Sequence, residues 1–393
     1  MKILIVNKFY YYRGGDCTAV FSTEQLLRSK GHETAIFSVK HPQNVPSAWE
    51  QYFPENISFS SGLSGKISAA IRIFHSREVS RKFKKILSDF KPDVVHLHNI
   101  HSYISPLVAK IAHKRGIRVV WTMHDYKLIC PVYICLRENK LCEECFNNKR
   151  KVLDHKCMKN SYAASFLAWM EACCWNRKKL SGYTDIFISP SHFLKGKMIE
   201  GGYSSEQIQV LHNFLPKKMP VPAIKNNYYC YVGRLSAEKG VDTLLESASQ
   251  LPYNLKIIGG GALFDSYKKK YRYEHIEFLG QMKPEELYPI VQKARFLAIP
   301  SVWYENNPFS VIEALCMGTP VLGSRIGGIP EMITEGEDGF LFTPGNITEL
   351  RDKISDCFRL FSNSYNFLKI AEDAQNKFGE ETFYNKLMKI YDH

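Results

Sequence analysis

Long hydrophobic runs are absent from this sequence of 393 residues, and no stretch reaches the ~18 uninterrupted apolar residues that a membrane-spanning helix needs. The N-terminal apolar run is too short for a secretory signal peptide, so we expect a cytoplasmic protein. Low-complexity tracts are also absent, and a hydrophobic content of 45% excludes a disordered chain. The length is typical of two domains.

Acidic residues are scarce in the first half of the chain. Residues 1–217 hold 32 Lys and Arg against 17 Asp and Glu, whereas residues 218–393 hold 20 against 22. The excess of positive charge, +13 overall, therefore lies in the first half. This asymmetry argues against nucleic-acid binding along the whole chain. It is compatible with one basic face that binds phosphate or an anionic membrane.

The sequence also gives no sign of a disulfide framework. It has 11 cysteines, an odd number, and no export signal. Five of them crowd into residues 130–157, two of these in a C-x2-C pair. Four thiolates in a reducing compartment can hold a tetrahedral zinc ion, which would support a loop-rich segment. The expected ligands of this structural zinc are Cys130, Cys142, Cys145 and Cys157.

Alternatives to this zinc site remain. His155 is a competing ligand and Cys135 is a spare thiol. Two further alternatives are reduced cysteines without any metal and an iron–sulfur cluster.

Short apolar strands alternate with amphipathic helical stretches, a pattern typical of parallel sheets covered on both faces. Three prolines within seven residues, near position 220, favour an extended linker between two such domains. Strands are expected at residues 2–7, 33–39, 93–97, 118–122, 228–232, 254–258, 276–279, 296–300 and 321–324. Helices are expected at residues 15–30, 104–115, 163–180, 241–250, 284–293 and 309–317.

Ligands of such sheets bind at the carboxyl ends of the strands. Arg234 follows a glycine turn after one predicted strand, and Lys239 lies five residues further on. Two cations at the mouth of a sheet suit a diphosphate, since arginine can bind two oxygens at once. A solvated basic loop is the alternative.

A second group of candidates follows the strand predicted at residues 296–300. An Asn-Pro pair interrupts the chain there, and a helix is expected to begin directly after it, so its first N–H groups are able to bind an anion. One glutamate precedes the helix and another lies a turn inside it. The candidates are Glu305, Asn307, Pro308, Phe309, Ser310 and Glu313.

The first half contributes two further motifs. Gly14 and Gly15 follow the first strand and let the backbone approach a phosphate closely. His124 and Asp125 end the strand predicted at residues 118–122. A plain turn and a structural histidine are the alternatives.

Together these motifs resemble glycosyltransferase family four, the retaining GT-B glycosyltransferases that use sugar nucleotides. The resemblance extends over nearly the whole chain, including residues 233–240, the E-x7-E element that ends at Glu313, and residues 327–339. The Cys-Pro pair after His124 and the later C-x2-C are similar to those of surface-polysaccharide enzymes of the family.

The resemblance implies an α/β fold of GT-B architecture, with two Rossmann-like, doubly wound parallel-sheet domains and an active site in the cleft between them. Residues 1–215 would bind the acceptor and carry the cysteine-rich insertion, about residues 129–181. Residues 216–375 would bind the sugar nucleotide. Residues 376–393 would form a C-terminal helix that packs back toward the first domain.

The resemblance also implies roles for the candidates. The diphosphate would be held by Arg234 and Lys239, and the ribose hydroxyls by Glu313. Glu305 would contact the transferred sugar, and the amides of residues 307–310 would hold the donor. In the first domain, Gly14 and Gly15 would approach the donor, and His124 would lie against its sugar.

Glycosyl transfer builds negative charge on the departing diphosphate, which cations and a helix start stabilise without a catalytic metal. We expect a retaining hexosyl- or related glycosyltransferase with a UDP-sugar donor (GDP is the alternative), a saccharide or lipid-linked acceptor, and no nucleic-acid partner. The catalytic residues would be Glu305, His124, Arg234 and Lys239.

Residues 66–91 interleave cations with apolar side chains, and residues 165–180 add aromatic residues followed by three cations. Such stretches bind anionic membranes, so we expect a peripheral protein on the inner face of the plasma membrane; an ordinary solvated helix is the alternative. The cations of the first stretch are Lys66, Arg72, Arg77, Arg81, Lys82, Lys84, Lys85 and Lys91.

Three other functions remain as alternatives. The same fold serves a sugar-nucleotide hydrolase or epimerase. A zinc-ribbon nucleic-acid-binding protein would use the cysteines and the basic charge, but it leaves the acidic second half without a purpose. A nicotinamide oxidoreductase is disfavoured, because the glycines at 259–261 lack the third glycine of G-x-G-x-x-G.

Overall fold

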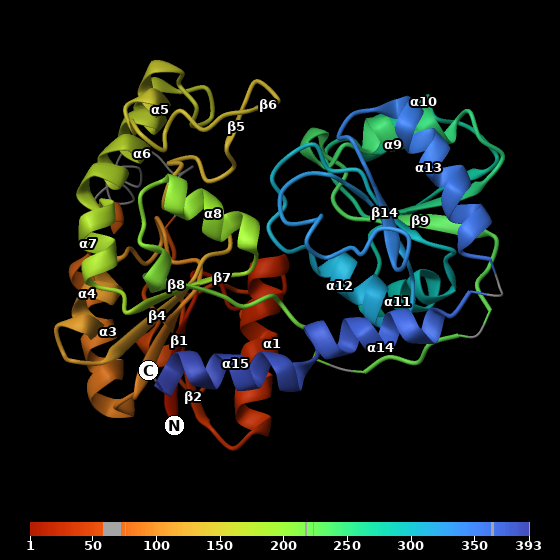
Figure 1. Cartoon of the computed structure of the whole chain (residues 1–393). Helices are drawn as coiled ribbons and strands as arrows, with labels where there is room; N and C mark the ends of the chain where they lie inside the picture. Colours follow the sequence, from red (N-terminus) through yellow and green to blue (C-terminus); the bar gives the residue numbers. More distant parts are fainter. Residues whose placement is uncertain (58–71, 75, 217, 223, 363–364, 393) are drawn as a thin grey trace. The chain divides into compact units, whose positions relative to one another are not determined.

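A computed structural model describes residues 1–57, 72–74, 76–216, 218–222, 224–362 and 365–392 (Figure 1). The chain divides into two compact units. The first comprises residues 1–137, 142–212 and 384–393, and the second comprises residues 138–141 and 213–383. Within the described residues, no helix has both the length and the apolar character needed to cross a bilayer.

The first unit is built on six parallel strands: β1 (Lys2–Val6), β2 (Glu33–Phe37), β3 (Val94–Leu97), β4 (Arg118–Thr122), β7 (Ile186–Ser189) and β8 (Ile208–Val210). They form one sheet in the order β2-β1-β3-β4-β7-β8. The first strand pairs with β2 on one side and with β3 on the other, both in parallel register. Ile3, Leu4 and Ile5 in β1 have no exposed surface, because helices cover both faces of the sheet.

Helices, two 3-10 turns and a short hairpin complete the described elements of residues 1–212, and residues 138–141 of the hairpin are counted with the second unit. In Figure 1, α1 lies on one side of the sheet, and α3 and α4 lie on the other. The helices are α1 (Gly15–Ser29), α3 (Arg77–Phe90), α4 (Leu107–His113), α5 (Lys151–Asp154), α6 (Tyr162–Cys174), α7 (Arg177–Gly182) and α8 (His192–Glu200). The turns are η1 (Glu50–Tyr52) and η2 (Ser205–Gln207), and the hairpin joins β5 (Leu136–Arg137) to β6 (Lys140–Leu141).

Helix α3 occupies most of the basic stretch that the sequence predicted to be amphipathic. The Ser76 side chain caps its N-terminus by accepting a hydrogen bond from the backbone N–H of Val79. Its apolar residues recur at helical spacing and are buried in the first unit, where the edge of Phe83 packs on Phe37. The apolar side of this helix is therefore core, and only its charged side faces solvent. Lys66, Ile67 and Ile71 lie outside the described residues.

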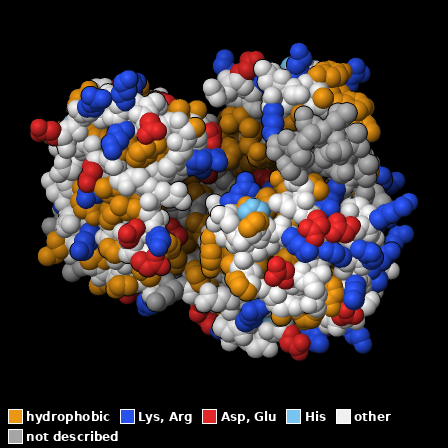
Figure 2. Space-filling view, turned by 180° about the vertical axis from the view of Figure 1, so that it is seen from behind, with side chains coloured by type: hydrophobic (Ala, Val, Ile, Leu, Met, Phe, Trp, Pro, Cys, Tyr) orange, Lys and Arg blue, Asp and Glu red, His pale blue; other side chains and the backbone are white. Residues whose placement is uncertain are grey.

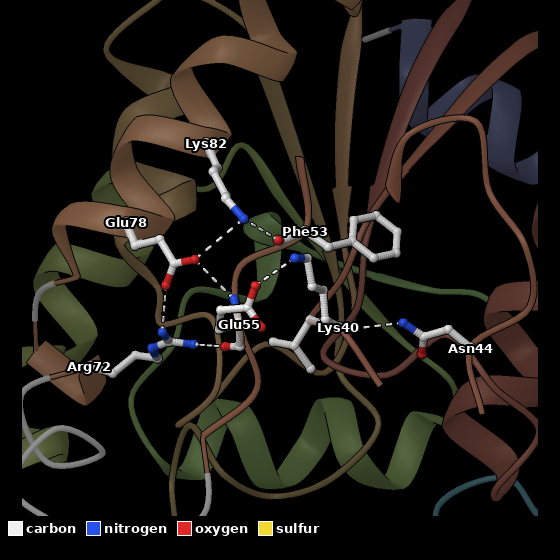
Figure 3. Close-up of polar contacts among 8 residues, drawn as sticks. Lys40, Asn44, Phe53, Glu55, Arg72, Glu78 and Lys82 are labelled. Carbon is white, nitrogen blue, oxygen red and sulfur yellow. Dashed lines mark hydrogen bonds and ion pairs between the residues drawn. The ribbon is translucent and has the colours of Figure 1, made fainter. Parts of the chain in front are cut away.

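One polar cluster ties the start of α3 to the loop that carries η1 (Figure 3). Glu78 binds Arg72 at 2.8 Å, lies 3.4 Å from Lys82, and accepts a hydrogen bond of 3.0 Å from the backbone of Glu55. Lys82 also donates to the carbonyl of Phe53. Arg72 and Lys82 are therefore engaged within the fold, unlike the exposed cations of α3.

The single helix predicted at residues 163–180 is wrong, because the structure has two helices there. Trp175 leaves the helical conformation after α6. Asn176 then caps α7, its side chain accepting a hydrogen bond from the N–H of Lys179. The strong N-capping preference of asparagine accounts for the break.

The second unit repeats the parallel design with β9 (Tyr228–Val232), β10 (Asn254–Ile258), β11 (Ile276–Gly280), β12 (Leu297–Ile299), β13 (Val321–Ser324) and β14 (Gly339–Phe342). The strand order is β11-β10-β9-β12-β13-β14. The helices are α9 (Val241–Ala248), α10 (Phe264–Lys270), α11 (Pro284–Lys293), α12 (Phe309–Cys316), α13 (Ile347–Leu360), α14 (Phe367–Phe378) and α15 (Glu380–Asp392), with the 3-10 turn η3 (Ala237–Lys239). Figure 1 shows α9 and α13 on one face of the sheet and α12 and α14 on the other.

From Tyr384 onward, α15 belongs to the first unit. The Tyr391 hydroxyl lies 2.7 Å from Nδ1 of His96, and Arg118 donates to the carbonyl of Ile390 at 2.8 Å. The predicted α/β class, with two doubly wound parallel sheets, is confirmed. Three strands of the six-stranded sheets, β7, β8 and β14, and the two hairpin strands, β5 and β6, were not predicted.

Candidate active site

The candidate residues of the second unit gather at the carboxyl ends of two neighbouring strands. Arg234 and Lys239 follow β9, and Glu305 follows β12, which pairs directly with β9. Because the strands are parallel, the loops after them lie at the same edge of the sheet. Residues 66 positions apart in the sequence are therefore brought into contact.

Lys239 and Glu305 form an ion pair with 2.6 Å between Nζ and Oε1. The Ser301 hydroxyl donates to the same carboxylate oxygen at 2.6 Å. Glu305 is buried, with 7% of its surface exposed. Burial by itself would raise the pKa of Glu305, but the charge and hydrogen bond of Lys239 outweigh it and hold that pKa below its usual value. Glu305 is thus an ionised carboxylate with one cation beside it.

Arg234 makes a separate ion pair. Its guanidinium lies 2.6 Å from Oε1 of Glu238 and 3.3 Å from the hydroxyl of Ser236, while 62% of its side chain is exposed. An exposed arginine held by one carboxylate can turn toward a more highly charged anion at small energetic cost. The structure therefore joins Lys239 to Glu305 and Arg234 to Glu238, and it does not join the two cations.

The backbone around this pair approaches closely at two glycines. Gly240 has a φ of +65°, and a Cβ there would lie 1.9 Å from the carbonyl of Pro300. Gly327 has a φ of +61°, and a Cβ there would lie 2.3 Å from the carbonyl of Glu305. Side chains at either position would push apart the loops that place Lys239 and Glu305 together.

Helix α12 begins as the sequence predicted. Pro308 precedes it in an extended conformation, and Phe309 and Ser310 are its first two residues. Their N–H groups have no partner inside the helix and remain able to bind an anion. Asn307 instead contacts Asn213. Its side-chain oxygen accepts a hydrogen bond of 2.7 Å from the backbone N–H of Asn213, and its carbonyl accepts one of 3.0 Å from the Asn213 side-chain amide.

Glu313 lies one turn inside α12, and no Lys, Arg or His of the described residues lies within 4.0 Å of its carboxylate. The Tyr288 hydroxyl donates to Oε1 at 3.2 Å. Burial raises the pKa of Glu313 to about 7, although the Tyr288 hydrogen bond opposes the shift. The two glutamates of the E-x7-E element therefore differ in state: Glu305 is ionised, whereas Glu313 is close to half protonated near neutral pH.

In the first unit, Gly14 and Gly15 stand exposed at the start of α1, with Gly14 fully extended. Asp16 follows them and accepts a hydrogen bond of 3.2 Å from Asn99. Burial favours the neutral form of Asp16, but His124, Lys8 and Asn99 together lower its pKa. Asp16 thus joins the start of α1 to the loop after β3 through its hydrogen bond with Asn99.

His124, which is partly exposed, belongs to a chain of histidines with the buried His96 and His98. Its Nε2 lies 2.9 Å from Nδ1 of His98, and the His98 ring is tilted against that of His96, with centroids 4.3 Å apart. Burial lowers the pKa of His124 to about 4 and that of His96 to about 3, so both rings are neutral at physiological pH. Tyr391, through its contact with His96, ends this chain.

Sequence reasoning missed His96, His98, Tyr288 and Glu238 as parts of the site. A signal for the first two was present, since His96 and His98 alternate at the end of β3, beside the strand that carries His124. Tyr288 and Glu238 offered no such signal, because their role depends on how α11 and η3 pack.

The cysteine cluster is only partly gathered. Cys130, Cys135 and Cys145 are buried, and hydrogen bonds from the other two thiols lower the pKa of Cys130. Among the described residues, however, no three of the cluster's sulfur atoms all lie within 4.8 Å of one another. The four predicted ligands are therefore not assembled, and Cys135, predicted to be a spare, contacts Cys130 instead.

Two family models match the chain. The one described as Glycosyltransferase Family 4 matches residues 14–217, and the one described as Glycosyl transferases group 1 matches residues 217–369. An uncharacterized 42.6 kDa protein in the cps region of Klebsiella pneumoniae is 28% identical over 355 residues, which cover 84% of this chain and 87% of that protein. An uncharacterized glycosyltransferase of Methanocaldococcus jannaschii is 26% identical over 212 residues, 53% of this chain and 60% of that protein.

Solved structures share the fold. Sucrose-phosphate synthase from Thermosynechococcus elongatus matches with a TM-score of 0.73 at 17% identity, covering 100% of this chain and 98% of that one. Anabaena HepE in complex with UDP-glucose matches with a TM-score of 0.64 at 16% identity, covering 100% of this chain and 99% of that one. The predicted GT-B class of fold is confirmed.

The state of Glu313 predicts a pH-dependent effect on stability. The folded protein keeps a proton that the unfolded chain releases near pH 4.5, so this carboxyl destabilises the fold progressively as pH rises from about 4.5 to 7. Glu313→Gln should therefore stabilise the ligand-free protein by up to about 3 kcal/mol at about pH 8, and hardly at about pH 4.5. Urea unfolding at the two pH values measures the difference.

The exposed Glu285 of α11 supplies the matched control, because Glu285→Gln should have little effect at either pH. An equal gain of stability at both pH values for Glu313→Gln would contradict a buried, protonated Glu313.

Proposed function

The chain belongs to glycosyltransferase family 4, and we propose that it transfers a sugar from a nucleoside-diphosphate donor to a saccharide or lipid-linked acceptor in cell-surface polysaccharide synthesis. The observation that carries the proposal is the Lys239–Glu305 pair at the strand ends, directly before the open N-terminus of α12. The match to a protein from a cps region supports polysaccharide synthesis.

The donor is held by the second unit in this proposal. Lys239 and Arg234 bind the diphosphate, the N–H groups of Phe309 and Ser310 bind its oxygens, and Glu313 accepts hydrogen bonds from the ribose. UDP is the favoured nucleotide, because the HepE structures contain UDP and UDP-glucose, and GDP is the alternative. From the first unit, Gly14 and Gly15 approach the donor, and His124 lies against its sugar.

The transfer retains configuration at the anomeric carbon. The bond from that carbon to the diphosphate oxygen breaks, and a bond to the acceptor oxygen forms on the same face. The acceptor's hydroxyl proton passes to the leaving phosphate oxygen, so atoms and charge balance without a protein nucleophile. Lys239 and Arg234 stabilise the charge that develops on the diphosphate, which is the part a divalent metal plays in other transferases. Glu305 orients Lys239 and lies toward the positive anomeric carbon.

Arg234 provides the clean test of the diphosphate site, because it is exposed and its loss leaves no buried charge. A panel of UDP-, GDP- and ADP-sugars should raise the melting temperature for one donor, by mass action. Arg234→Ala should weaken that stabilisation and lower transfer by about 100- to 1000-fold. The exposed Arg272→Ala is the control and should change neither. Normal transfer by a folded Arg234→Ala protein would contradict the assignment.

Lys239→Ala is a less simple variant than the sequence indicates. Removing the lysine leaves Glu305 buried and ionised without its cation, which typically destabilises a protein by about 3–5 kcal/mol. The double variant Lys239→Met, Glu305→Gln removes both charges and should recover the stability but not the activity.

Peripheral membrane binding is part of the same proposal. Helix α6 exposes Tyr162, Phe166 and Met170 at intervals of one turn, and three cations follow it at residues 177–179. Figure 2 shows Lys and Arg side chains crowded on a face of the first unit around a few acidic ones. Apolar side chains beside such cations suit the headgroup region of an anionic bilayer.

Vesicle sedimentation tests this binding. The variant with Arg81, Lys84 and Lys85 all changed to Gln should lose about 100-fold in affinity for anionic vesicles, since each basic residue contributes about 1 kcal/mol. Lys82 is left unchanged because it belongs to the Glu78 cluster. Phe166→Ser should weaken binding as well.

A matched control changes Lys268, Lys269 and Arg272, exposed cations of the second unit, to Gln and should bind as before. Equal binding of the original protein to neutral vesicles, or none to anionic ones, would show that α3 is an ordinary solvated helix.

We also propose a structural zinc ion in the insertion, with Cys130 and Cys145 among its ligands and Cys157 near them. Cys142 completes the C-x2-C pair, whereas Cys135 is the thiol in contact with Cys130. A site closed by four thiolates leaves no position for substrate, so the ion would support the insertion and take no part in the chemistry.

Metal analysis of protein purified without chelator should find about one zinc per chain. Cys145→Ser should lose the metal and much of the stability, while the exposed Cys173→Ser should keep both. Whichever of Cys135→Ser and Cys142→Ser loses zinc identifies the fourth ligand. A folded, active protein without metal would end the hypothesis.

A further inference from the structure

The first unit contains a cavity of about 420 Å³ that the assigned roles leave unused. It lies between the loop after β4, the cysteine-rich insertion and the junction of α6 with α7, and its wall includes Lys127, Lys149, Glu171, Trp175 and Arg177. Its volume is in the range of small-molecule sites, about 300–1000 Å³.

The charges of this cavity do not balance. Lys127 is neutralised by Glu171, with 2.8 Å between Nζ and Oε2. Lys149 donates to the carbonyl of Ile129 and Arg177 to that of Gly201, and no described carboxylate lies within 4.0 Å of either cation. The hydrogen bonds of Lys149 and Arg177 thus go to backbone carbonyls, although the thiols of Cys145 and Cys130 lie near Lys149, and the exposed Lys178 lines the cavity as well. An oxyanion is the ligand group that such a pair binds.

Two buried polar atoms on the wall also lack a partner. Oε1 of Glu171 accepts no hydrogen bond from the described residues, and Nδ1 of His101 lies 4.0 Å from it. Burial lowers the pKa of His101 far below its usual range, so the ring there is neutral. The Tyr203 hydroxyl is likewise buried without a partner. Glu171 and Tyr203 are each about 3% exposed, and buried groups of this kind normally have partners.

The remaining wall suits a sugar ring. Trp175 is held in place by a hydrogen bond of 3.0 Å from Nε1 to the carbonyl of Ile73, and Phe146 and Leu128 lie on the same cavity. Aromatic surfaces with a few polar groups are typical of small-molecule sites. Glu171 can accept from a sugar hydroxyl, and Tyr203 can donate to one.

This cavity adjoins the histidine chain. A second, very small cavity, lined by His98 and His124, shares His101 and Leu128 with it. A ligand in the larger cavity would therefore lie beside the residues that face the donor sugar in the proposed function.

We propose that this cavity binds the acceptor, and that the acceptor carries an oxyanion next to a sugar, with Lys149 and Arg177 on the oxyanion and Glu171 on a sugar hydroxyl. Calling the ligand an acceptor rests on the proposed function, but the binding of an anionic sugar in the cavity does not depend on it. The oxyanion has two chemical sources, the phosphate of a lipid-linked sugar and the carboxylate of an acidic glycan.

Calorimetric titration distinguishes these sources. Glucose 1-phosphate, glucuronate, inorganic phosphate and glucose are titrated into the full chain with saturating UDP, so that the diphosphate site is occupied. Glucose 1-phosphate should bind and glucose should not. Tighter binding of glucuronate than of glucose 1-phosphate would assign the cavity to a carboxylate. Equal binding of glucose and glucose 1-phosphate, or no binding of either anionic sugar, would overturn the proposal.

Variants locate the binding. Lys149→Gln and Arg177→Gln should each weaken glucose 1-phosphate by at least ~10-fold, as the loss of one charge-assisted hydrogen bond requires. Arg150→Gln and Lys179→Gln, which change exposed neighbours outside the cavity, should bind normally. Melting curves check that each variant is folded.

Unchanged affinity in both cavity variants would place the anion elsewhere and reject the proposal. A chain that transfers no sugar from any donor, yet shows the expected variant pattern, would contradict the proposed function and leave the cavity assignment standing.

Discussion

All strand pairings in the two six-stranded sheets are parallel, and this constraint determines where the chemistry lies. Helical crossovers return each strand to the same end of its sheet, so the loops after neighbouring strands meet at one edge. In the second unit this brings Lys239, after β9, within 2.6 Å of Glu305, after β12. In the first unit it brings His98, after β3, within 2.9 Å of His124, after β4. Glycines at 240 and 327 permit the loops of the second unit to approach closely enough.

Burial gives these groups their different states. Glu305 remains ionised because Lys239 accompanies it, whereas Glu313, with only the Tyr288 hydroxyl beside it, keeps its proton up to about pH 7. His124 is neutral because desolvation lowers its pKa to about 4. A bound donor would supply partners that these groups lack in the free protein.

The insertion in the first unit connects the proposals that concern the acceptor. Helix α6 turns Phe166 and Met170 to solvent, while Glu171 on the same helix lines the cavity and binds Lys127. A lipid-linked acceptor needs both parts, an apolar surface that meets the bilayer and a polar cavity that receives its head. The cysteine cluster lies in the same insertion, so a zinc ion there would stabilise the cavity wall without touching the substrate.

The sequence by itself determined the class of fold, most strands, and the positions of the site residues along the chain, because these depend on local patterns: apolar runs, glycine turns and the Asn-Pro break before α12. The sequence could not determine which side chains form ion pairs and hydrogen bonds with one another. Packing between elements that are distant in sequence decides these pairs. It places Lys239 on Glu305 and Arg234 on Glu238. It also brings Asn307 to Asn213 and His96 to Tyr391, which lies near the end of the chain. The cavity beside Glu171 was invisible for the same reason. Only the tertiary structure sets burial, and burial decides which charges need a partner and which are left without one.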